Sequence, residues 1–503
     1  MRFAAPGWMV LYLAVLLLCC AGWLLKQPAI IDAAAAVWFL LILLPGLIAR
    51  PYNRRMMQQK YAAARRVARI LSWLHPADGC RELPEIVHAL ELAQQGELAA
   101  ASEMLNRFQN VTSLIGLSAI ANLYRITNQW EEFLAWQSRH PRELARHSQL
   151  LPIILRTRGE VGDVRGLVEL YDRHRKQIRK LVPITYRDTC RLMLFAFCGK
   201  RQAVESLCAG TLAVFPASVR AFWLATADLE AGEAESAKRQ FEELLPAADP
   251  LLRAAIERRL SRISLRPEPL DATAERIVAE AATEHGHEEK FGAQRSLFSK
   301  RARATQIFIA LNVFMFVAES CLGGGTNMRV LYRLGALFPP AVRAGEWWRL
   351  IASMFLHYGA LHLTMNMLGL WFLGPFVEFA LGFRRFMLVY LLAGIGSMAT
   401  VLAFSSGAHA ESLTVGASGC VMGLVGATGS LMFRGWLREN ALAAKRRLGL
   451  MLLIVSMEAL FDSMVPQVSM TAHLSGALIG FVATLVLRDR LRPPAPQQPA
   501  LKS

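Results

Sequence analysis

Residues 415–419 read Val-Gly-Ala-Ser-Gly and begin an apolar stretch long enough to cross a membrane as a helix. Two more such stretches begin with polar residues: Thr-Ala-His-Leu-Ser-Gly at 471–476, and His-Tyr-Gly-Ala-Leu-His-Leu-Thr-Met-Asn at 357–366. Polar side chains are expensive in hydrocarbon, so they indicate a functional site. Ser418 is a nucleophile, His473 is a base, and the amide and imidazole groups of 357–366 are hydrogen-bond donors. Together these groups indicate acyl transfer inside a membrane.

The composition of the whole chain also favours a membrane protein. Its 503 residues are 54% hydrophobic and carry a net charge of +17, and the mean hydropathy is +0.31. Lysine and arginine flank the apolar stretches without a base-stacking motif, so the charge indicates membrane topology and not nucleic-acid binding. The eight cysteines lack the spacing of a metal site or a disulfide framework. We therefore interpret them as free thiols and predict neither a metal nor a cofactor.

Eight stretches are long and apolar enough to span a bilayer, and their flanking charges fix their direction. They lie at about 8–25, 29–48, 305–322, 358–378, 386–404, 416–433, 448–463 and 470–487. The basic clusters all fall on one side if both termini are cytoplasmic. The fourth, sixth and eighth spans then begin on the outer side. Their polar residues therefore share one depth in the outer leaflet; these residues are His357, His362, Asn366, Ser418 and His473.

The first two spans lie within residues 1–50. A cleaved signal peptide is the alternative for residues 8–25, but no convincing small-x-small cleavage site follows, and the second span comes at once. We expect a retained transmembrane hairpin.

A soluble helical region is predicted for residues 51–265, which are rich in Ala, Leu, Glu and Arg and poor in strand signals. Turn-like residues recur there about every 34 residues, a period that resembles degenerate tetratricopeptide repeats. These residues are Gly96, Asn128, Gly162, Gly199 and Gly232. An irregular helical domain is the alternative. Residues 266–300 are expected to form a polar linker, and residues 491–503 a disordered tail.

Four motifs in a fixed order make residues 305–488 resemble the rhomboid family of intramembrane serine proteases. They are Trp348-Arg349, His362-x-x-x-Asn366, Gly416-x-Ser418-Gly419 and Ala472-His473-x-x-Gly476-x-x-x-Gly480. The first lies in the loop after the third span, and the others lie at helix starts on the same side. The resemblance covers somewhat over a third of the chain. It implies a six-helix membrane bundle, whose bounds we set at 301–490.

Ser418 needs a base to take its proton, and His473 is the histidine of the last span. No Asp or Glu of a span is expected near His473, so a Ser–His dyad is the economical interpretation, and the family implies the same. A developing oxyanion needs hydrogen-bond donors. The candidates are the Asn366 amide, the His362 imidazole and the Ser418 backbone N–H, and rhomboid proteins use both side chains in this way.

Small residues predict close packing between the sixth and eighth spans. Gly416 and Gly419 open the sixth span, and Gly476 and Gly480 line the eighth. Close approach would bring the serine within hydrogen-bond reach of the histidine. Taken alone, however, a Gly-x-Ser-Gly sequence can be a packing motif, a histidine at a helix end can be interfacial, and the His/Asn pair can simply fix the bundle.

The resemblance also implies supporting roles in the loop 323–357. Arg349, next to Trp348, is expected to hold this loop, which is partly embedded in the outer leaflet. Glu378 matches a family acid that anchors the same loop. A tryptophan-rich interfacial anchor is the alternative interpretation of this region.

Two further residues lie near the predicted site. Met422 stands one turn after the serine, where many rhomboid proteins carry an aromatic residue that stacks on the histidine. A thioether can still pack against an imidazole. His357 either supports the loop or the oxyanion site, or simply lies at the membrane interface.

We therefore predict an all-α membrane protein: a six-helix rhomboid bundle preceded by a transmembrane hairpin and a helical-repeat soluble domain. The expected activity is that of a rhomboid-type serine endopeptidase of a bacterial inner membrane, with both termini cytoplasmic. It would cleave transmembrane protein substrates near the extracytoplasmic face, while the soluble domain recruits a protein partner. A catalytically silent scaffold that binds membrane helices is one alternative, and the presence of Ser418 and His473 argues against it. A transporter is the other, and the spans show no inverted repeat.

Overall fold

The computed structural model describes residues 6–75, 80–110, 113–264, 269–292, 302–405, 412–464 and 469–491. The chain divides into two compact units, Met1–Ala281 and Ala282–Ser503. The described residues form helices and loops, with one isolated β-bridge between Leu337 and Thr414. The prediction of an all-helical protein is therefore confirmed for this part of the chain. The predicted tail lies outside the described residues, apart from Leu491.

Unit 1 begins with apolar helices. α1 spans Pro6–Leu24 and α2 spans Pro28–Trp38, and a π-helical turn, η1 (Phe39–Leu43), joins α2 to α3 (Leu44–Met57). The second predicted span, 29–48, is thus part of a longer helical run. The helix continues past the apolar stretch, because arginines from Arg50 onward interrupt the apolar pattern without interrupting the helix.

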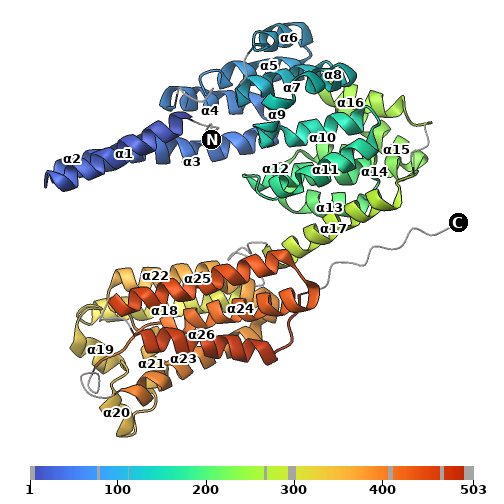
Figure 1. Cartoon of the computed structure of the whole chain (residues 1–503). Helices are drawn as coiled ribbons and strands as arrows, with labels where there is room; N and C mark the ends of the chain where they lie inside the picture. The colour runs from blue at the N-terminus through green and yellow to red at the C-terminus, as the bar shows by residue number, and fades with distance from the viewer. Residues whose placement is uncertain are drawn as a thin grey trace. The chain divides into compact units, whose positions relative to one another are not determined.

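The rest of unit 1 is built from consecutive packed helices (Figure 1). They are α4 (Tyr61–Leu74), α5 (Leu83–Gln95), α6 (Leu98–Asn106), α7 (Leu114–Ile126), α8 (Trp130–Arg139), α9 (Pro141–Ala145), α10 (Leu151–Glu160), α11 (Val164–Ile178), α12 (Ile184–Phe197), α13 (Arg201–Ala209), α14 (Ala217–Glu230), α15 (Ala234–Leu244) and α16 (Pro250–Leu260). Short 3-10 turns interrupt them at η2 (Ser148–Leu150), η3 (Thr211–Val214) and η4 (Leu245–Ala247).

The five turn-like residues read from the sequence all have positive φ and lie between consecutive helices. They are Gly96 (φ +97°), Asn128 (+59°), Gly162 (+87°), Gly199 (+65°) and Gly232 (+89°). A residue in the left-handed region ends one helix and lets the chain reverse into the next. The helical content of this region is established, and its likeness to tetratricopeptide repeats stays a prediction.

The stretch expected to be a polar linker contains a helix, α17 (Ala272–Gly292). The boundary between the two units falls within it. Its last turns belong to unit 2, because Phe291 is 1% exposed there and its carbonyl accepts a hydrogen bond of 2.7 Å from Arg447.

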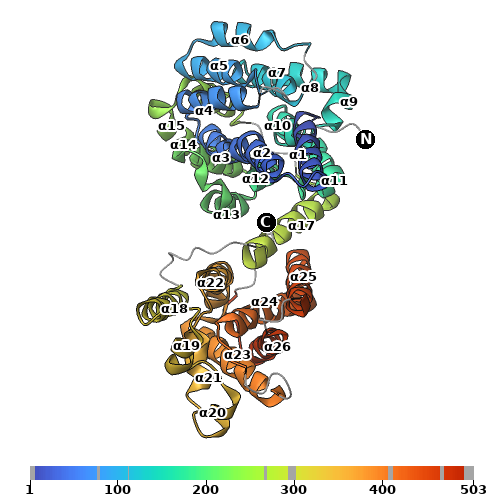
Figure 2. The ribbon, with the colours of Figure 1, turned by 90° about the vertical axis from the view of Figure 1, so that its left-hand side faces the viewer.

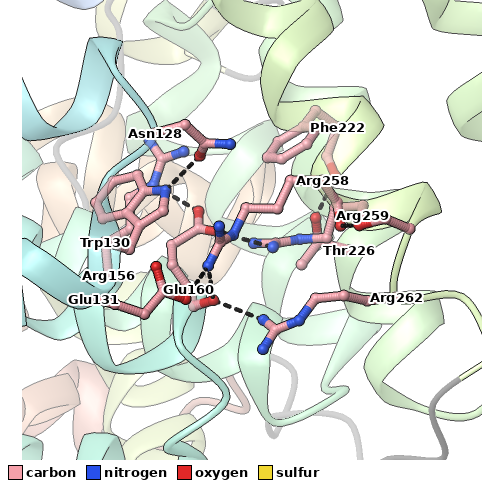
Figure 3. Close-up of polar contacts among 11 residues, drawn as sticks. Asn128, Trp130, Glu131, Arg156, Glu160, Phe222, Thr226, Arg258, Arg259 and Arg262 are labelled. Carbon is pink, nitrogen blue, oxygen red and sulfur yellow. Dashed lines mark hydrogen bonds and ion pairs between the residues drawn. The ribbon is translucent and has the colours of Figure 1, made fainter.

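A buried ion-pair cluster ties α16 to α10 inside unit 1 (Figure 3). Glu160 is 2% exposed, and its carboxylate accepts from Arg156 at 3.0 Å and from Arg259 at 2.8 Å. Its backbone carbonyl accepts from Arg258 at 3.0 Å and from Arg262 at 2.6 Å. Burial alone would raise the pKa of Glu160, but the charges of Arg259 and Arg156 lower it to about 2.

Unit 2 holds the remaining helices (Figure 1). They are α18 (Arg303–Cys321), α19 (Met328–Leu334), α20 (Pro339–Arg343), α21 (Arg349–Ala352), η5 (Ser353–Phe355), α22 (Ala360–Leu381), α23 (Phe383–Phe404), α24 (Ser418–Glu439), α25 (Leu442–Met464) and α26 (Met470–Val486). Gly382, with φ +82°, ends α22 and begins α23. α24 lies at the centre, in contact with α22, α23, α25 and α26 (Figure 2).

Among the described residues, five helices are long and apolar enough to cross a membrane. They are Ala33–Met57, α18, α22, α23 and α24. α26 and the stretch Gly7–Gly22 are apolar but shorter. α25 is long enough, but it begins with a basic cluster and carries Glu458 and Asp462 near its end. Among the described residues, therefore, fewer helices than the eight predicted spans are both long enough and apolar enough to cross a membrane.

We expect the Glu160→Gln substitution to destabilise unit 1 by roughly 3–5 kcal/mol, because it leaves buried arginines without their anion. The pKa of Glu160 is lowered from its ordinary value of 4.5 to about 2. The carboxylate therefore stabilises the wild type above pH 4.5, and this stabilisation is lost as the pH falls toward 2. Hydrogen exchange of α10 and α16 in increasing denaturant measures both effects.

Glu131→Gln is the matched control, because the Glu131 side chain binds the same Arg258 at 2.7 Å but is 61% exposed. Its loss should stay below about 1 kcal/mol. Equal losses in the two variants would contradict a structural role for the buried ion pairs.

Candidate active site

Ser418 is the first residue of α24, and the loop between α18 and α22 fixes the segment before it. Leu337 and Thr414 exchange two backbone hydrogen bonds of 3.0 Å. The Gly416 N–H donates to the Ser353 carbonyl at 2.9 Å, and the φ of +130° at Gly416 favours glycine. Ser418 is therefore held half-buried at a helix N-terminus, where its backbone N–H has no acceptor within the helix.

Glycines on both helices bring α26 close to α24. A Cβ at Gly476 would collide with the carbonyl oxygen of Gly419, and one at Gly480 would collide with that of Gly423. The two backbones are therefore in direct contact, which is the close approach that small residues predict. His473, one turn before Gly476, is 4% exposed and lies level with the start of α24.

Two carboxylates of α25 lie against His473. Its Nδ1 is 2.8 Å from Asp462 Oδ2 and 3.3 Å from Glu458 Oε1. The expectation that no Asp or Glu lies near His473 is wrong. Glu458 and Asp462 are four residues apart and so share one face of α25. The spacing was visible in the sequence, but the helix that this face contacts depends on the rotation of α25 in the bundle.

The same three side chains could hold a metal ion. Ligand atoms of Glu458, Asp462 and His473 all lie within 4.8 Å of one another. Two carboxylates at this separation repel each other, and a cation or an N–H group between them relieves the repulsion. The imidazole Nδ1 occupies that place here.

α22 presents His362 to the start of α24. The Tyr358 N–H donates to His362 Nδ1 at 3.3 Å, so a neutral ring carries its proton on Nε2. That nitrogen faces Gly416, since an ideal Cβ there would lie 2.9 Å from His362 Nε2 and 3.7 Å from Ser418 Oγ. The serine hydroxyl and an imidazole N–H donor thus lie beside the same glycine.

Asn366, one turn later on α22, is 5% exposed. Its Nδ2 donates to the His362 carbonyl at 3.0 Å, which leaves a second N–H of the amide for a ligand. Farther along both helices, a Cβ at Gly369 would lie 2.6 Å from the Val421 side chain. α22 and α24 therefore run side by side with Asn366 and Ser418 at the same level.

His357 lies behind His362, with their ring centroids 5.3 Å apart in a T-shaped contact. It is 0% exposed, so its side chain packs inside the protein. Its backbone N–H donates to Glu319 Oε1 at 3.0 Å. Glu319, a fully buried acid of α18, fastens the end of the 323–357 loop and was not among the predicted site residues. An acid inside an apolar span was the available signal.

Arg349 holds the same loop from inside. It is 3% exposed, and its guanidinium donates to the carbonyls of Tyr332 at 2.7 Å and Ala336 at 3.1 Å. It also packs over the rings of Tyr332 and Trp348. Trp348 is 50% exposed, which is typical of an aromatic side chain at a membrane surface.

Glu378 does not anchor this loop, and that expectation is corrected. Its carboxylate accepts from the backbone N–H groups of Ala304 at 2.8 Å and Thr305 at 2.9 Å, and from the Thr305 hydroxyl at 2.8 Å. It therefore caps the N-terminus of α18, where the helix dipole favours a negative charge.

Met422 fills the layer below the site. It is 5% exposed and packs in an apolar cluster with Val425, Met451 and Ala477. These residues come from α24, α25 and α26, so the thioether helps to join the three helices that carry the serine, the acids and the histidine.

The arrangement supplies the groups that acyl transfer requires. Ser418 offers a nucleophile, and the His473 ring, bound at Nδ1, is left with Nε2 as a proton acceptor. His362, Asn366 and the helix N-terminus offer donors for a developing oxyanion.

Comparison with known proteins matches residues 344–490 to the Rhomboid domain. The chain is 35% identical over 184 residues to the rhomboid protease GluP of Bacillus subtilis, which is 36% of this chain and 34% of GluP. It is 37% identical over 165 residues to RHOMBOID-like protein 5 of Arabidopsis thaliana, covering 32% of this chain and 51% of that relative. The chain thus spans a third to a half of the length of these curated relatives.

YdcA of Bacillus subtilis, also named for the rhomboid proteases, is 32% identical over 147 residues. The match covers 29% of this chain and 69% of YdcA. Together with the candidate membrane helices, these likenesses identify a multi-pass integral membrane protein. Through its C-terminal part, the chain belongs to the rhomboid family.

Proposed function

We propose that this chain is an intramembrane serine protease of the rhomboid type. The observation that carries the proposal is the placement of Ser418 beside the His362 imidazole, across a glycine interface from a buried His473. GluP, to which the C-terminal part is similar, is named a rhomboid protease. A nucleophile, a base and oxyanion donors in one layer are what acyl transfer needs.

The proposed reaction passes through an acyl-enzyme. Ser418 Oγ attacks the carbonyl carbon of the scissile peptide bond while its proton passes to His473 Nε2. The oxyanion accepts hydrogen bonds from Asn366, His362 and the Ser418 N–H. The protonated His473 then gives its proton to the leaving amine, and a water molecule, activated by the same imidazole, hydrolyses the ester.

The proposed substrates are transmembrane proteins, cleaved near the extracytoplasmic membrane face. The basic residues between the spans support a bacterial inner-membrane protein with both termini cytoplasmic. This direction puts the starts of α22, α24 and α26 in the outer leaflet. Water must then reach the site from the outer side.

The proposed division of the chain separates catalysis from recruitment. It comprises a transmembrane hairpin at 1–50, a helical-repeat domain at 51–265, a linker at 266–300, the protease at 301–490 and a tail at 491–503. The helical-repeat domain would bind a partner protein or a substrate tail in the cytoplasm. It cannot supply catalytic groups if the site lies in the opposite leaflet.

Ser418→Ala and His473→Ala should each reduce cleavage of a reporter transmembrane substrate on the order of 10⁶-fold, and the double variant should be no worse, because the two groups act as one unit. Ser418→Ala should also lose labelling by a fluorophosphonate probe. Ser475→Ala is the matched control, since this hydroxyl donates to carbonyls of its own helix, those of Thr471 at 2.6 Å and Ala472 at 3.3 Å. Unchanged cleavage by Ser418→Ala would favour a catalytically silent scaffold.

Asn366→Ala should lower kcat by roughly 10²–10³-fold and leave KM nearly unchanged, because an oxyanion donor acts in the transition state. Thr364→Ala, which removes an exposed hydroxyl bonded to the Ala360 carbonyl at 2.8 Å, should be neutral. Steady-state kinetics and a melting curve of both variants decide the point. A loss of only a few fold, together with a lower melting temperature, would show that Asn366 serves packing.

A fragment that begins at Ala282 should retain the kcat of the full chain on a substrate without a cytoplasmic tail. It keeps Phe291, whose ring blocks the Cβ position of Gly435. A substrate whose tail binds the helical-repeat domain should lose efficiency on truncation through KM, because tethering raises its effective concentration. If the folded fragment cleaves neither substrate, unit 1 has a structural or allosteric role in catalysis.

A further inference from the structure

We propose that Asp462 is a positioning residue that turns the Ser418–His473 pair into a Ser–His–Asp set. The inference rests on the proposed protease function and deepens it. Asp462 Oδ2 lies 2.8 Å from His473 Nδ1, and the residue comes from α25, a different helix from either reacting group. The carboxylate would fix the imidazole and stabilise its positive charge as the proton arrives.

Burial makes this contact the main polar environment of Asp462. Its side chain is 0% exposed, and its second oxygen, Oδ1, is buried without a hydrogen-bond partner among the described residues. An unpaired carboxylate in such a place is strongly unfavourable. The hydrogen bond between Asp462 and His473 is therefore the interaction that offsets the free-energy cost of burying the Asp462 carboxylate.

The hydrogen bond also selects the tautomer of His473. An ionised carboxylate only accepts hydrogen bonds, so Nδ1 of the ring must carry the proton. The lone pair then lies on Nε2, the nitrogen that must take the proton of Ser418. The opposite tautomer would present an N–H to the serine and could not act as a base.

Among the described residues, two carboxylates lie within ion-pair distance of His473 Nδ1, and both Asp462 and Glu458 come from α25. Glu458 is farther from Nδ1, at 3.3 Å, and its side chain is 39% exposed. Its charge is therefore better screened by solvent than that of Asp462.

The test uses the full-length protein and a reporter transmembrane substrate. Asp462→Asn should lower kcat on the order of 10⁴-fold, as in soluble triads, with little change in KM. Glu458→Gln should lose much less. Asp489→Asn, which removes an acid paired with Arg434 at 2.9 Å beyond the far end of α26, is the charge-matched control and should keep its activity.

Several outcomes would overturn the proposal. One is an active Asp462→Asn, within a few fold of the wild type, while Ser418→Ala is dead; the protease function would then stand with a simple dyad. Another is a larger loss in Glu458→Gln than in Asp462→Asn. If a chelator abolishes wild-type activity and Zn²⁺ restores it, His473 Nδ1 is a metal ligand and the positioning role is wrong. Activity in Ser418→Ala would instead refute the proposed function itself.

A measurement on the wild type keeps the test valid if Asp462→Asn fails to fold. The ¹⁵N resonances of the His473 ring report which nitrogen carries the proton. They are assigned by their absence from the spectrum of His473→Ala. In the neutral ring, the proton should reside on Nδ1. A neutral ring protonated on Nε2 would overturn the proposal without any change at Asp462.

Discussion

Direct contact between the backbones of α24 and α26 is the constraint on which the candidate active site depends. Gly476 touches the carbonyl of Gly419, and Gly480 touches that of Gly423, so any side chain at these positions would force the helices apart. Membrane helices gain little from hydrophobic burial against lipid, and they associate through this kind of close packing. The separation between the serine and the histidine is therefore set by the backbones themselves.

Buried acids hold the helices and loops around this contact in place, and each acid binds a different partner. Glu378 caps α18, Glu319 binds the His357 N–H, and Asp462 binds the His473 ring. A buried carboxylate is tolerated only when donors surround it, so each acid specifies which segment must lie beside it. Glu160 does the same in unit 1 with guanidinium groups. In both units the apolar core supplies cohesion, while the few buried charges specify how the helices are arranged.

Local patterns in the sequence were sufficient for the helical character of the described residues, for the turns at positions such as Gly96 and Gly232, and for the closeness of Ser418 to His362. Helix periodicity, left-handed turn residues and the alternating direction of spans are properties of short segments. They did not predict α17, which lies in a stretch whose polar composition indicates a linker. The partners of Asp462 and Glu378 could not be predicted, because they depend on how each helix is rotated about its axis against its neighbours. The helix that contains the second predicted span continues into α3, because charge ends an apolar stretch without ending a helix.

A glycine interface also restricts how this protein can change during evolution. Substitutions at Gly476 or Gly480 add atoms where carbonyl oxygens of α24 already lie, and substitutions at Gly419 or Gly423 add atoms where side chains of α23 lie, so these positions offer no route to gradual variation. Selection must act through the helices that touch this pair from outside, α22, α23 and α25. Divergence among related chains should therefore accumulate around an invariant spine, and directed evolution of this protein should begin with libraries on those three flanking helices.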